Sequence, residues 1–540
     1  MTESLSSEST QLEKKPGQER GAASSIRSNS SNSKVEATVN DAQANQSVDL
    51  EQQIKGEQVA AISPRAAILL FIGLAMATFL ASLDGTIIAT ALPKIASDFK
   101  AQSQMSWVAT AYLLTYNAFQ PLYGKFSDIF GRKVMILFAI FTFMIGSAGA
   151  GGATTMNMLI AFRAIQGLGG SGLLSIVLII ISDIFPLEQR PKYQSIIWSV
   201  FGISSVVGPL LGGVFVEQTT WRWCFLINLP LGVITIVSVL IFLRLPFERQ
   251  AFKEQIARVD FLGTFLIIAA VICLLLPITW GGTEYAWNSA VIIVLFCIAA
   301  LLIAALLWAE YRATEAVIPL RLFRNPTVSL IFGVNFLTGM GFLGVIFYSP
   351  IYFQVVKGVG ATGSGLHLLP MVLGLVIASI GSGALLTKIP DYRIFIWIGT
   401  AMTAVGIGLF LQTCMVAAQA AVEKRDMAVV TALCGFFNSI GGGIGIAICS
   451  ALFNNHIKSK FEQFPEEVLY VIVQYNIAAE ITNVQKLPGD VKTFVIGAYV
   501  DTFQFIYKCI TPIACAAFLL SLFIRKLRKL DPSEVIMGAA

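Results

Sequence analysis

Charged residues are scarce in this chain of 540 residues. Asp, Glu, Lys and Arg together make up 13% of it, whereas hydrophobic residues make up 56%. A soluble domain typically carries about 25% charged residues. With a mean hydropathy of +0.74, the chain has too little polar surface to stay dissolved in water. The composition therefore excludes an ordinary soluble protein and predicts one that lies in a lipid bilayer.

Histidine and paired cysteines are also scarce. The chain has two histidines and eight cysteines, and no cysteines have the C-x-x-C spacing, so we expect no disulfide framework and no metal site. It lacks a P-loop, an H-E-x-x-H and a G-x-S-x-G motif, so we expect no enzyme, no cofactor and no direct use of ATP. The net charge of +5 follows from basic loops and indicates no nucleic-acid partner.

Apolar segments recur from residue 66 onward. Each has about 20 residues, enough to cross roughly 30 Å of hydrocarbon as a helix. The pattern predicts an all-α polytopic membrane protein. The expected spans are 66–91, 106–125, 134–153, 157–182, 194–215, 224–243, 261–280, 290–309, 328–353, 364–387, 394–421, 428–453 and 504–524.

Basic residues fall in every second connector between these segments. Arg190 and Lys192 lie in one loop and Arg321 in a later one, whereas connectors 154–156 and 281–289 carry no Lys or Arg. Short loops rich in Lys and Arg stay on the cytoplasmic side of a membrane. We therefore expect a cytoplasmic amino terminus.

Segment 394–421 breaks this alternation. Lys388 and Arg393 precede it, and Lys424 and Arg425 follow it, so a single crossing would put one basic pair outside. Two crossings need about 40 residues. We therefore hypothesise that about 30 residues are absent near 405–408, through a splice variant or a gene-model error, and that thirteen apparent spans represent fourteen. The alternative is a real thirteen-span protein with a strained segment, and sequencing the transcript across this point distinguishes the two.

The connector after the second span carries the most specific motif. It combines two glycines, an acid at a helix end and two cations: Gly124, Asp128, Gly131, Arg132 and Lys133. This pattern resembles the signature loop of the major facilitator superfamily of transporters. The resemblance implies two six-helix halves, with the two further spans lying between them, and a gate at the cytoplasmic end formed by these five residues.

Two charges lie inside expected spans. Asp84 is in the first span and Arg163 in the fourth. A carboxylate at membrane depth costs about 2.5–3.5 kcal/mol on insertion scales, so it indicates a function. The string around Asp84 resembles the first-span signature of the fourteen-span drug:proton antiporters, and the string around Arg163 resembles the fourth-span motif of the superfamily. With the other motifs, the likeness is closest to fungal multidrug and mycotoxin efflux pumps. The resemblance implies that Asp84 and Arg163 couple transport to protons; a wetted Asp84 and a snorkelling Arg163 are the structural alternatives.

The fifth span is rich in small residues. Glycines let helices approach closely, and a proline bends a helix. The string resembles the antiporter motif of the superfamily, which implies a hinge, while simple packing is an equal alternative on physical grounds. The expected hinge residues are Gly202, Gly208, Pro209, Gly212 and Gly213.

Polar and aromatic residues within the spans are candidates for a substrate cavity. An apolar, aromatic cavity with a few polar groups suits amphipathic organic molecules. Packing between helices is the alternative for each. The candidates are Tyr112, Gln166, Asn335, Tyr348, Tyr352, Gln354 and Asn438.

The division of the chain follows from these patterns. We expect a disordered cytoplasmic tail at 1–63, an N-terminal six-helix bundle at 64–245 and a linker with two extra helices at 246–312. A C-terminal bundle at 313–526 would include an outer loop at 455–503 whose apolar stretches lie along the membrane surface. A cytoplasmic tail would follow at 527–540. Trp221 and Trp223 are expected at the membrane interface, where tryptophans are enriched.

The sequence thus predicts a proton-coupled exporter of small amphipathic compounds such as drugs or fungal toxins. The alternatives are a proton-coupled exchanger of siderophores or other metal chelates, and a non-transporting sensor of the same fold. We expect a monomer whose partners are its substrate, protons and lipid. The plasma membrane is the expected location, and the vacuolar membrane is the alternative.

Overall fold

The computed structural model describes residues 64–101, 104–187, 189–243, 251–282, 284–386, 391–401, 406–475 and 481–525. The predicted tails at 1–63 and 527–540, Lys388, and residues 402–405 next to the expected deletion lie outside the described residues. What the sequence predicts for them stays a prediction.

The described part of the chain is helical, with no strand beyond an isolated bridge between Gly281 and Tyr285. The all-α prediction is confirmed. The first half of the chain forms α2 (Pro64–Asp98), α3 (Met105–Phe130), α4 (Arg132–Gly151), α5 (Met156–Ile184), α6 (Arg190–Gln218), α7 (Trp223–Leu226), α8 (Asn228–Phe242), α9 (Phe252–Ala257), α10 (Phe261–Trp280) and α11 (Ala290–Arg312).

The second half contains both very long and very short helices. It forms η2 (Leu320–Arg324), α12 (Pro326–Val355), α13 (Ala361–His367), α14 (Leu369–Leu386), α15 (Tyr392–Ala401), α16 (Gly406–Ala420), η3 (Lys424–Asp426), α17 (Met427–Phe461), α18 (Glu466–Gln474), η4 (Ile481–Lys486) and α19 (Gly489–Leu522).

Eleven helices among the described residues are long and apolar enough to cross a membrane. The chain is therefore an integral membrane protein. The expected second span, α3, is 26 residues long but is not one of the eleven. Its middle carries polar residues such as Thr115, Asn117 and Gln120, and it packs against α5 and α17. A helix that is covered by protein needs less apolar surface than a helix that faces lipid.

Close helix packing depends on glycine in both halves. A Cβ at Gly169 of α5 would overlap the backbone of Phe143 in α4. In the second half, a Cβ at Gly441 of α17 would overlap the carbonyl oxygen of Phe336 in α12, and one at Gly445 would overlap that of Met340. Small residues let helix backbones approach each other in a membrane, where the lipid is as apolar as the side chains. These glycines set the spacing of α4–α5 and α12–α17.

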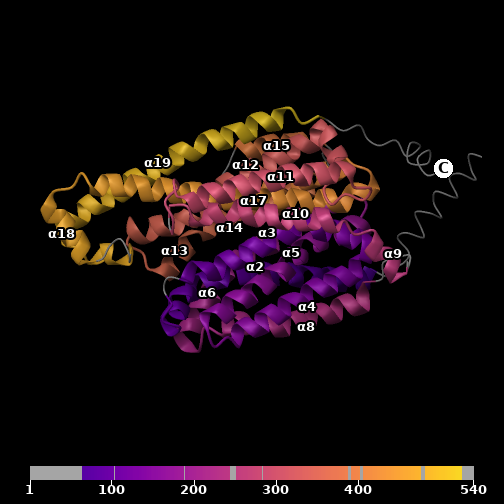
Figure 1. Cartoon of the computed structure of the whole chain (residues 1–540). Helices are drawn as coiled ribbons and strands as arrows, with labels where there is room; N and C mark the ends of the chain where they lie inside the picture. The colour runs from indigo at the N-terminus through magenta and orange to yellow at the C-terminus, as the bar shows by residue number, and fades with distance from the viewer. Residues whose placement is uncertain are drawn as a thin grey trace, which may run out of the picture. The chain divides into compact units, whose positions relative to one another are not determined.

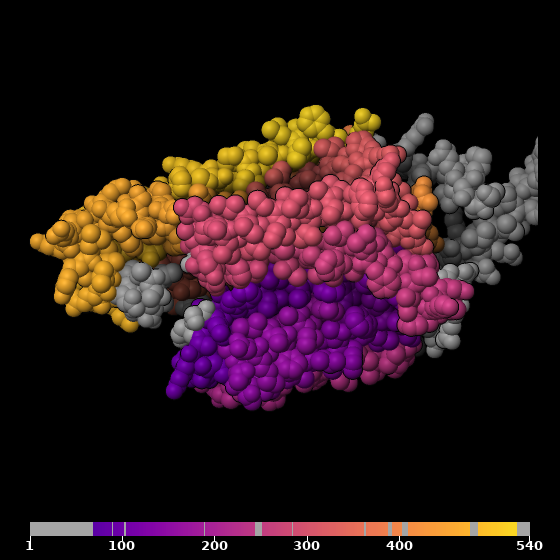
Figure 2. All heavy atoms as spheres, viewed as in Figure 1, coloured from indigo at the N-terminus to yellow at the C-terminus, as the bar shows by residue number. Residues whose placement is uncertain are grey.

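The two extra helices, α10 and α11, lie between the two halves. Figure 2 shows them across the front of the molecule, between the indigo and purple helices and the orange ones. α10 packs against both α3 and α17, and Trp280 at its end meets Trp107 of α3 edge to face, with ring centroids 5.4 Å apart. α10 therefore covers the seam where α3 meets α17, and α11 packs against α10.

The halves meet closely at one end of the molecule. Gly124 near the end of α3 lies against Ala428 near the start of α17, where a Cβ would be 3.0 Å from the Ala428 carbonyl oxygen. Gln194 of α6 donates a hydrogen bond to Gln419 of α16 at 3.2 Å. α9 marks the same end, at the right of Figure 1. We call it the basic end because its loops and helix ends carry Lys125, Arg132, Lys133, Lys192, Arg258 and Arg321.

The expected single segment 394–421 forms two helices, α15 and α16. They have 10 and 15 residues, which correspond to lengths of about 15 and 22 Å. Neither length crosses roughly 30 Å of hydrocarbon. The described residues therefore contain two half-length helices where the sequence suggested one crossing.

Both outer ends of the α15–α16 pair lie at the basic end. Tyr392 at the start of α15 donates a hydrogen bond to the Arg525 carbonyl after α19, at 2.7 Å. Asn325 before α12 donates to the Ala421 carbonyl after α16, at 2.9 Å. The chain thus enters and leaves this pair on one side. The described basic residues on both flanks therefore lie on the same side, as the charge alternation requires. Two truncated helices are what the hypothesis of missing residues requires, and that hypothesis stays a prediction.

Two smaller expectations gain structural detail. Trp221 is 5% exposed, packs on Phe225 and donates a hydrogen bond to Asp98 at 3.0 Å, whereas Trp223 is 48% exposed. An interfacial position of both tryptophans stays a prediction. The expected outer loop 455–503 is mostly helical where it is described, because α17 and α19 extend into it. Val468 and Ile472 of α18 are buried in a cluster with residues of these helices, whereas Tyr470 and Val473 of the same helix are exposed. A position of these stretches along the membrane surface stays a prediction.

Candidate functional site

Asp84 lies in the middle of α2 and is fully buried. The neighbouring polar residues satisfy their hydroxyl groups on the helix itself: Ser82 donates to the Thr78 carbonyl and Thr86 to the Leu83 carbonyl. Asp84 has no such local partner because a carboxylate only accepts hydrogen bonds. Its partners must come from other helices, and α5 and α8 supply them.

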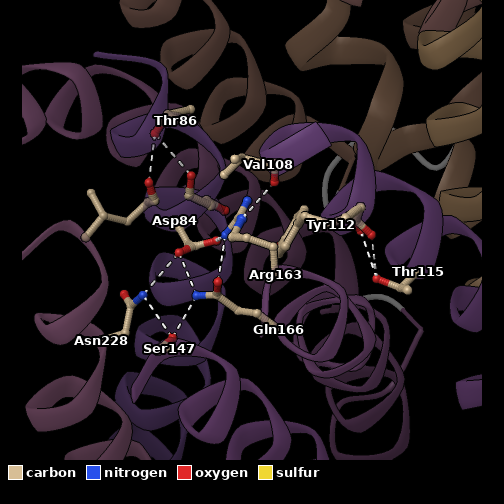
Figure 3. Close-up of polar contacts among 12 residues, drawn as sticks. Asp84, Thr86, Val108, Tyr112, Thr115, Ser147, Arg163, Gln166 and Asn228 are labelled. Carbon is tan, nitrogen blue, oxygen red and sulfur yellow. Dashed lines mark hydrogen bonds and ion pairs between the residues drawn. The ribbon is translucent and has the colours of Figure 1, made fainter. Parts of the chain in front are cut away.

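Arg163 of α5 is the main partner of Asp84, and it is 1% exposed. Its Nη1 lies 2.5 Å from Asp84 Oδ2. The same nitrogen donates to Gln166 Oε1 at 2.7 Å, and Gln166 Nε2 donates to Asp84 Oδ1 at 2.7 Å. Arg163 and Gln166 are three residues apart and share one face of α5. The three side chains form a closed ring, drawn in Figure 3.

Two residues that the sequence reasoning did not single out complete this cluster. Asn228 at the start of α8 donates to Asp84 Oδ1 at 3.2 Å and to Ser147 Oγ of α4 at 3.2 Å. Gln166 Nε2 also donates to Ser147 Oγ, at 2.7 Å. An amide inside an apolar segment is a signal that could have identified Asn228. Ser147 could not have been identified, because serines are common in membrane helices.

The guanidinium of Arg163 makes further contacts of its own. Its Nε donates to the Val108 carbonyl of α3 at 3.1 Å, and its central carbon lies 4.3 Å from the centre of the Tyr112 ring. A carbonyl oxygen and an aromatic face both attract a cation. Of the predicted cavity residues, Tyr112 and Gln166 therefore belong to the charge cluster. We call Asp84, Ser147, Arg163, Gln166 and Asn228 the buried cluster.

The buried cluster resists a change in its charge. Asp84 accepts hydrogen bonds from Arg163, Gln166 and Asn228, which all stabilise the carboxylate. A proton on Asp84 would leave Arg163 as a buried cation without its anion, and breaking a buried pair in this way typically costs about 3–5 kcal/mol. Neutralisation of Asp84 is therefore favourable only together with a rearrangement of the helices around it.

The predicted gate residues lie at the basic end, around Arg132 at the start of α4. Arg132 pairs with Asp128 of α3 at 2.6 Å and with Asp183 of α5 at 2.8 Å. Lys133 donates instead to the carbonyls of Leu240 and Leu243 at the end of α8, at 2.8 and 3.0 Å. These contacts connect α3, α4, α5 and α8.

The two predicted gate positions require glycine for different structural reasons. Gly131 separates α3 from α4 and has a φ of 89°, which L side chains rarely adopt. Gly124 lies against α17, with a Cβ position only 2.9 Å from Ala432 Cβ. The loop thus joins α3, α4, α5 and α8 to α17 in the second half of the chain.

The predicted hinge residues of α6 face different neighbours. Cβ atoms at Gly208 and Gly212 would overlap Thr86 and Thr90 of α2, whereas Gly202 faces Val376 of α14. Gly213 has nothing within 4 Å of its Cβ position. α6 continues through Pro209 as one helix of 29 residues. Gly208 and Gly212 therefore hold α6 close to the helix that carries Asp84.

The remaining cavity candidates do not converge on one place. Asn438 of α17 donates to the Asn335 carbonyl of α12 at 3.2 Å. Tyr348 and Tyr352 lie in an aromatic cluster with α17 and α19. Gln354 donates to Ser364 of α13 at 3.1 Å. These contacts are helix-packing contacts, and a substrate role for the residues stays a prediction.

Nothing in the described ranges resembles a metal centre, since no group of three or more His, Cys, Asp or Glu side chains is placed to hold an ion. The fold and the site instead define a class: a polytopic helical membrane protein with a buried, paired charge between helices. Residues 74–460 match the Major Facilitator Superfamily. The chain belongs to this superfamily and is a transporter, not an enzyme.

Similar curated proteins are transporters of the same superfamily. The MFS-type efflux pump MFS1 of Arthroderma benhamiae is 39% identical over 414 residues, which cover 71% of this chain and 77% of that protein. The MFS-type transporter VdtG of Byssochlamys spectabilis is 34% identical over 485 residues, covering 84% and 86%. The efflux pump FUS6 of Gibberella fujikuroi is 30% identical over 507 residues, covering 87% and 91%.

Solved structures show the same fold. The human organic anion transporter MFSD10 (TETRAN) aligns with a TM-score of 0.54 at 11% identity and covers 85% of this chain and 100% of its own. A bacterial homolog of the human lysosomal transporter Spinster aligns with a TM-score of 0.50 at 15% identity and covers 86% and 100%.

Proposed function

We propose that this transporter is a proton-coupled antiporter that exports small amphipathic organic compounds. The buried cluster is the observation that carries the proposal. A charged pair is expensive to place inside a membrane protein and is a functional-site hypothesis by default. Asp84 is the member of the pair that can take up a proton, since Arg163 stays charged at any physiological pH.

Proton binding and helix movement are linked through the buried cluster. Because a proton on Asp84 leaves Arg163 unpaired, the protonated state favours an arrangement in which these side chains separate or reach water. The cluster joins α2, α4, α5 and α8, so its rearrangement changes how these helices pack. A proton gradient can then drive a change between two shapes of the transporter.

The basic end supports a cycle of alternating access. It is closed by the contacts of α3 with α17 and of α6 with α14 and α16. In the proposed cycle the bundles 64–245 and 313–526 rock against each other and the Arg132 ion pairs open at this end. Gly202, Gly208, Pro209, Gly212 and Gly213 would serve as the pivot of α6.

The direction of transport and the kind of substrate follow the relatives. MFS1 of Arthroderma benhamiae and FUS6 of Gibberella fujikuroi are named efflux pumps. Drugs or toxins are therefore the proposed cargo. We further propose a monomer in the plasma membrane, with the basic end and the amino terminus facing the cytoplasm, because short basic loops are retained on that side.

The test uses the purified full-length protein in liposomes that contain a pH-sensitive dye. An imposed proton gradient should drive ethidium, a cationic amphipathic probe, against its concentration gradient, and added ethidium should in turn move protons. Asp84→Asn should abolish both movements. Asp98→Asn is the matched control, because Asp98 lies on the same helix but is exposed and pairs with Lys94.

The outcomes separate the alternatives. Ethidium movement without proton movement would contradict antiport, and normal coupling in Asp84→Asn would remove Asp84 from the mechanism. No movement of ethidium or of a panel of amphipathic toxins, with ferric siderophores moving instead, would favour a chelate exchanger. A folded protein that moves none of these compounds would favour a sensor.

A further inference from the structure

Four buried glutamines lie where the two halves of the protein meet at the basic end. Gln120 belongs to α3 and Gln194 to α6, and Gln412 and Gln419 both belong to α16. Each of the four is at most 2% exposed. An amide that is buried away from water must find hydrogen-bond partners in the protein. We call these four residues the amide seam.

The two glutamines of α16 reach across to the first half. Gln194 Nε2 of α6 donates to Gln419 Oε1 at 3.2 Å, and Gln419 Nε2 donates to Thr431 Oγ1 of α17 at 3.0 Å. Gln412 Nε2 donates to the Pro191 carbonyl at the start of α6, while its Oε1 accepts from a serine of α14 at 3.2 Å. Each of these two amides therefore bonds to α6 with one end and to its own half with the other end.

The backbones also approach closely around the amide seam. A Cβ on Gly383 of α14 would lie 2.7 Å from the Pro191 carbonyl oxygen, and one on Gly435 of α17 would lie 2.5 Å from Gln120 Nε2. Neither glycine position has room for a methyl group. The amide seam is therefore part of a tightly packed contact.

Two oxygens of the amide seam, Gln120 Oε1 and Gln194 Oε1, have no hydrogen-bond partner among the described residues. A buried polar atom without a partner destabilises the arrangement that buries it, whereas a hydrogen bond stabilises it. The closed basic end thus contains hydrogen bonds that favour closure. It also contains two oxygens that favour opening, because water reaches them when the halves separate.

The ion pairs of the basic end do not join the two halves in this way. The pairs of Arg132 lie within the first half, the pair between η2 and η3 lies within the second, and Lys125 pairs with Glu315 in the turn after α11. Arg190 of α6 does reach α17, where it donates to the Met427 sulfur, a neutral group. Among the described residues, no ion pair joins a helix of α2–α8 to a helix of α12–α19.

We propose that the amide seam sets how readily the basic end opens: its hydrogen bonds hold the two halves together, and its two unpartnered oxygens lower the free energy needed to separate them. Neutral groups respond neither to pH nor to salt, so this contact does not sense the proton concentration on its own side of the membrane. In the transport cycle, a proton would act at the buried cluster, and the amide seam would set the cost of the opening that follows. The role of the amide seam in that cycle rests on the proposed function, but its effect on the equilibrium between the closed and open ends does not.

Chemical labelling of a reporter cysteine measures this equilibrium in the full-length protein in lipid nanodiscs. Ser195 of α6 is 2% exposed, and its Oγ lies 2.5 Å from the Cβ position of Gly383, so Ser195→Cys places a thiol in the closed contact. A charged, water-soluble maleimide reaches this thiol only when the basic end is open. Peptide mapping by mass spectrometry separates the reporter from the eight native cysteines.

Methionine substitutions in this background should have opposite effects at two positions, since methionine is unbranched like glutamine but lacks the amide. Gln419→Met leaves Gln194 without its partner and should raise the labelling rate about fivefold or more. Gln120→Met removes an unpartnered oxygen and should lower the rate about fivefold or more. Replacement of both partners, Gln194→Met with Gln419→Met, leaves no unpartnered amide at their contact, and Thr431 keeps its bond to the Met427 carbonyl. This double variant should label no faster than the reporter protein alone.

Thr338→Val is the matched control and should leave the labelling rate unchanged, because it removes an unpartnered hydroxyl from α12, which packs against helices of its own half. Changes of the same sign in Gln419→Met and Gln120→Met, or no change in either, would overturn the proposal, as would a double variant that labels as fast as Gln419→Met. So would an effect of Gln419→Met that disappears in high salt, because screening acts on ion pairs. Labelling needs neither a substrate nor a proton gradient, so its result is independent of whether the protein moves ethidium.

Discussion

Two of the arginine–carboxylate pairs among the described residues have opposite surroundings. Arg163 and Asp84 are 1% and 0% exposed, whereas Arg258 and Glu315 at the basic end are each 34% exposed. Exposed pairs typically contribute about 0–1 kcal/mol, and breaking a buried pair costs about 3–5 kcal/mol. The same chemistry thus serves two purposes. The buried pair makes a change of charge expensive, and the exposed pair can open and close at little cost.

The largest expected difference comes from removing the arginine of each pair. Arg163→Ala should destabilise the protein by about 3–5 kcal/mol, because Asp84 is left as an uncompensated buried charge. Arg258→Ala should cost less than about 1 kcal/mol. Thermal unfolding in detergent measures both. Equal effects of the two substitutions would show that burial does not control the strength of these pairs.

A smaller effect is expected from one hydrogen bond of the buried cluster. Asn228→Leu removes a donor to Asp84, and a hydrogen bond to a charged group contributes about 1.5–3 kcal/mol. The buried carboxylate loses part of its compensation, so the unfolding temperature in detergent should fall. Asn117→Leu is the control, because Asn117 donates only to the Leu113 carbonyl of its own helix. A shift in both variants would contradict a specific role of Asn228.

A larger side chain between α6 and α2 should destabilise the protein by a similar or smaller amount. Gly212→Val places methyl groups against Ile87 and Thr90, and overpacking typically costs about 1–3 kcal/mol. Gly213→Val enters open space and should stay within about 0.5 kcal/mol. Unfolding temperatures of the two variants give the comparison. Similar losses would contradict the close contact of α6 with α2.

The smallest effect is expected at Glu315. Burial alone would raise the pKa of Glu315, but hydrogen bonds from Arg258 and Lys125 outweigh it and hold the pKa below its ordinary value. The pairs therefore contribute fully above that ordinary value, and the contribution is lost as the pH falls through the lowered pKa. Glu315→Gln should cost about 0.2–1 kcal/mol at low salt.

Salt separates the two clusters in the same experiment. In 1 M NaCl the effect of Glu315→Gln on the unfolding temperature should disappear, because exposed charges are screened. The effect of Arg163→Ala should persist. An Arg163→Ala effect that vanishes in salt would show that the buried cluster is open to the solvent.

Individual residues show where the sequence was sufficient. Asp84 and Arg163 could be identified because a charge in an apolar run is rare and expensive, and no other information is needed to notice it. Their mutual pairing required the fold, since 79 residues separate them in the chain. Asn228 carried a signal, an amide inside an apolar segment, whereas Ser147 had none, because hydroxyls occur in many membrane helices and only its contacts with Gln166 and Asn228 distinguish it.

The segment at 394–421 shows a second limit. Its composition predicts one long span, but the basic residues on both flanks are inconsistent with a single crossing. α15 packs against α19 and α16 packs against α14 and α12, and the local sequence does not contain these contacts.

The sequence by itself determined that this protein lies in a membrane, that it is helical, and that Asp84 and Arg163 are costly charges. Each of these properties depends on the free energy of transferring residues from water to hydrocarbon, which is set by the residues of one segment. The tertiary structure decided which groups neutralise those charges, which buried amide oxygens stay unpartnered and which end of the molecule is closed. Those properties depend on distances between residues far apart in the chain, and a linear pattern does not record such distances.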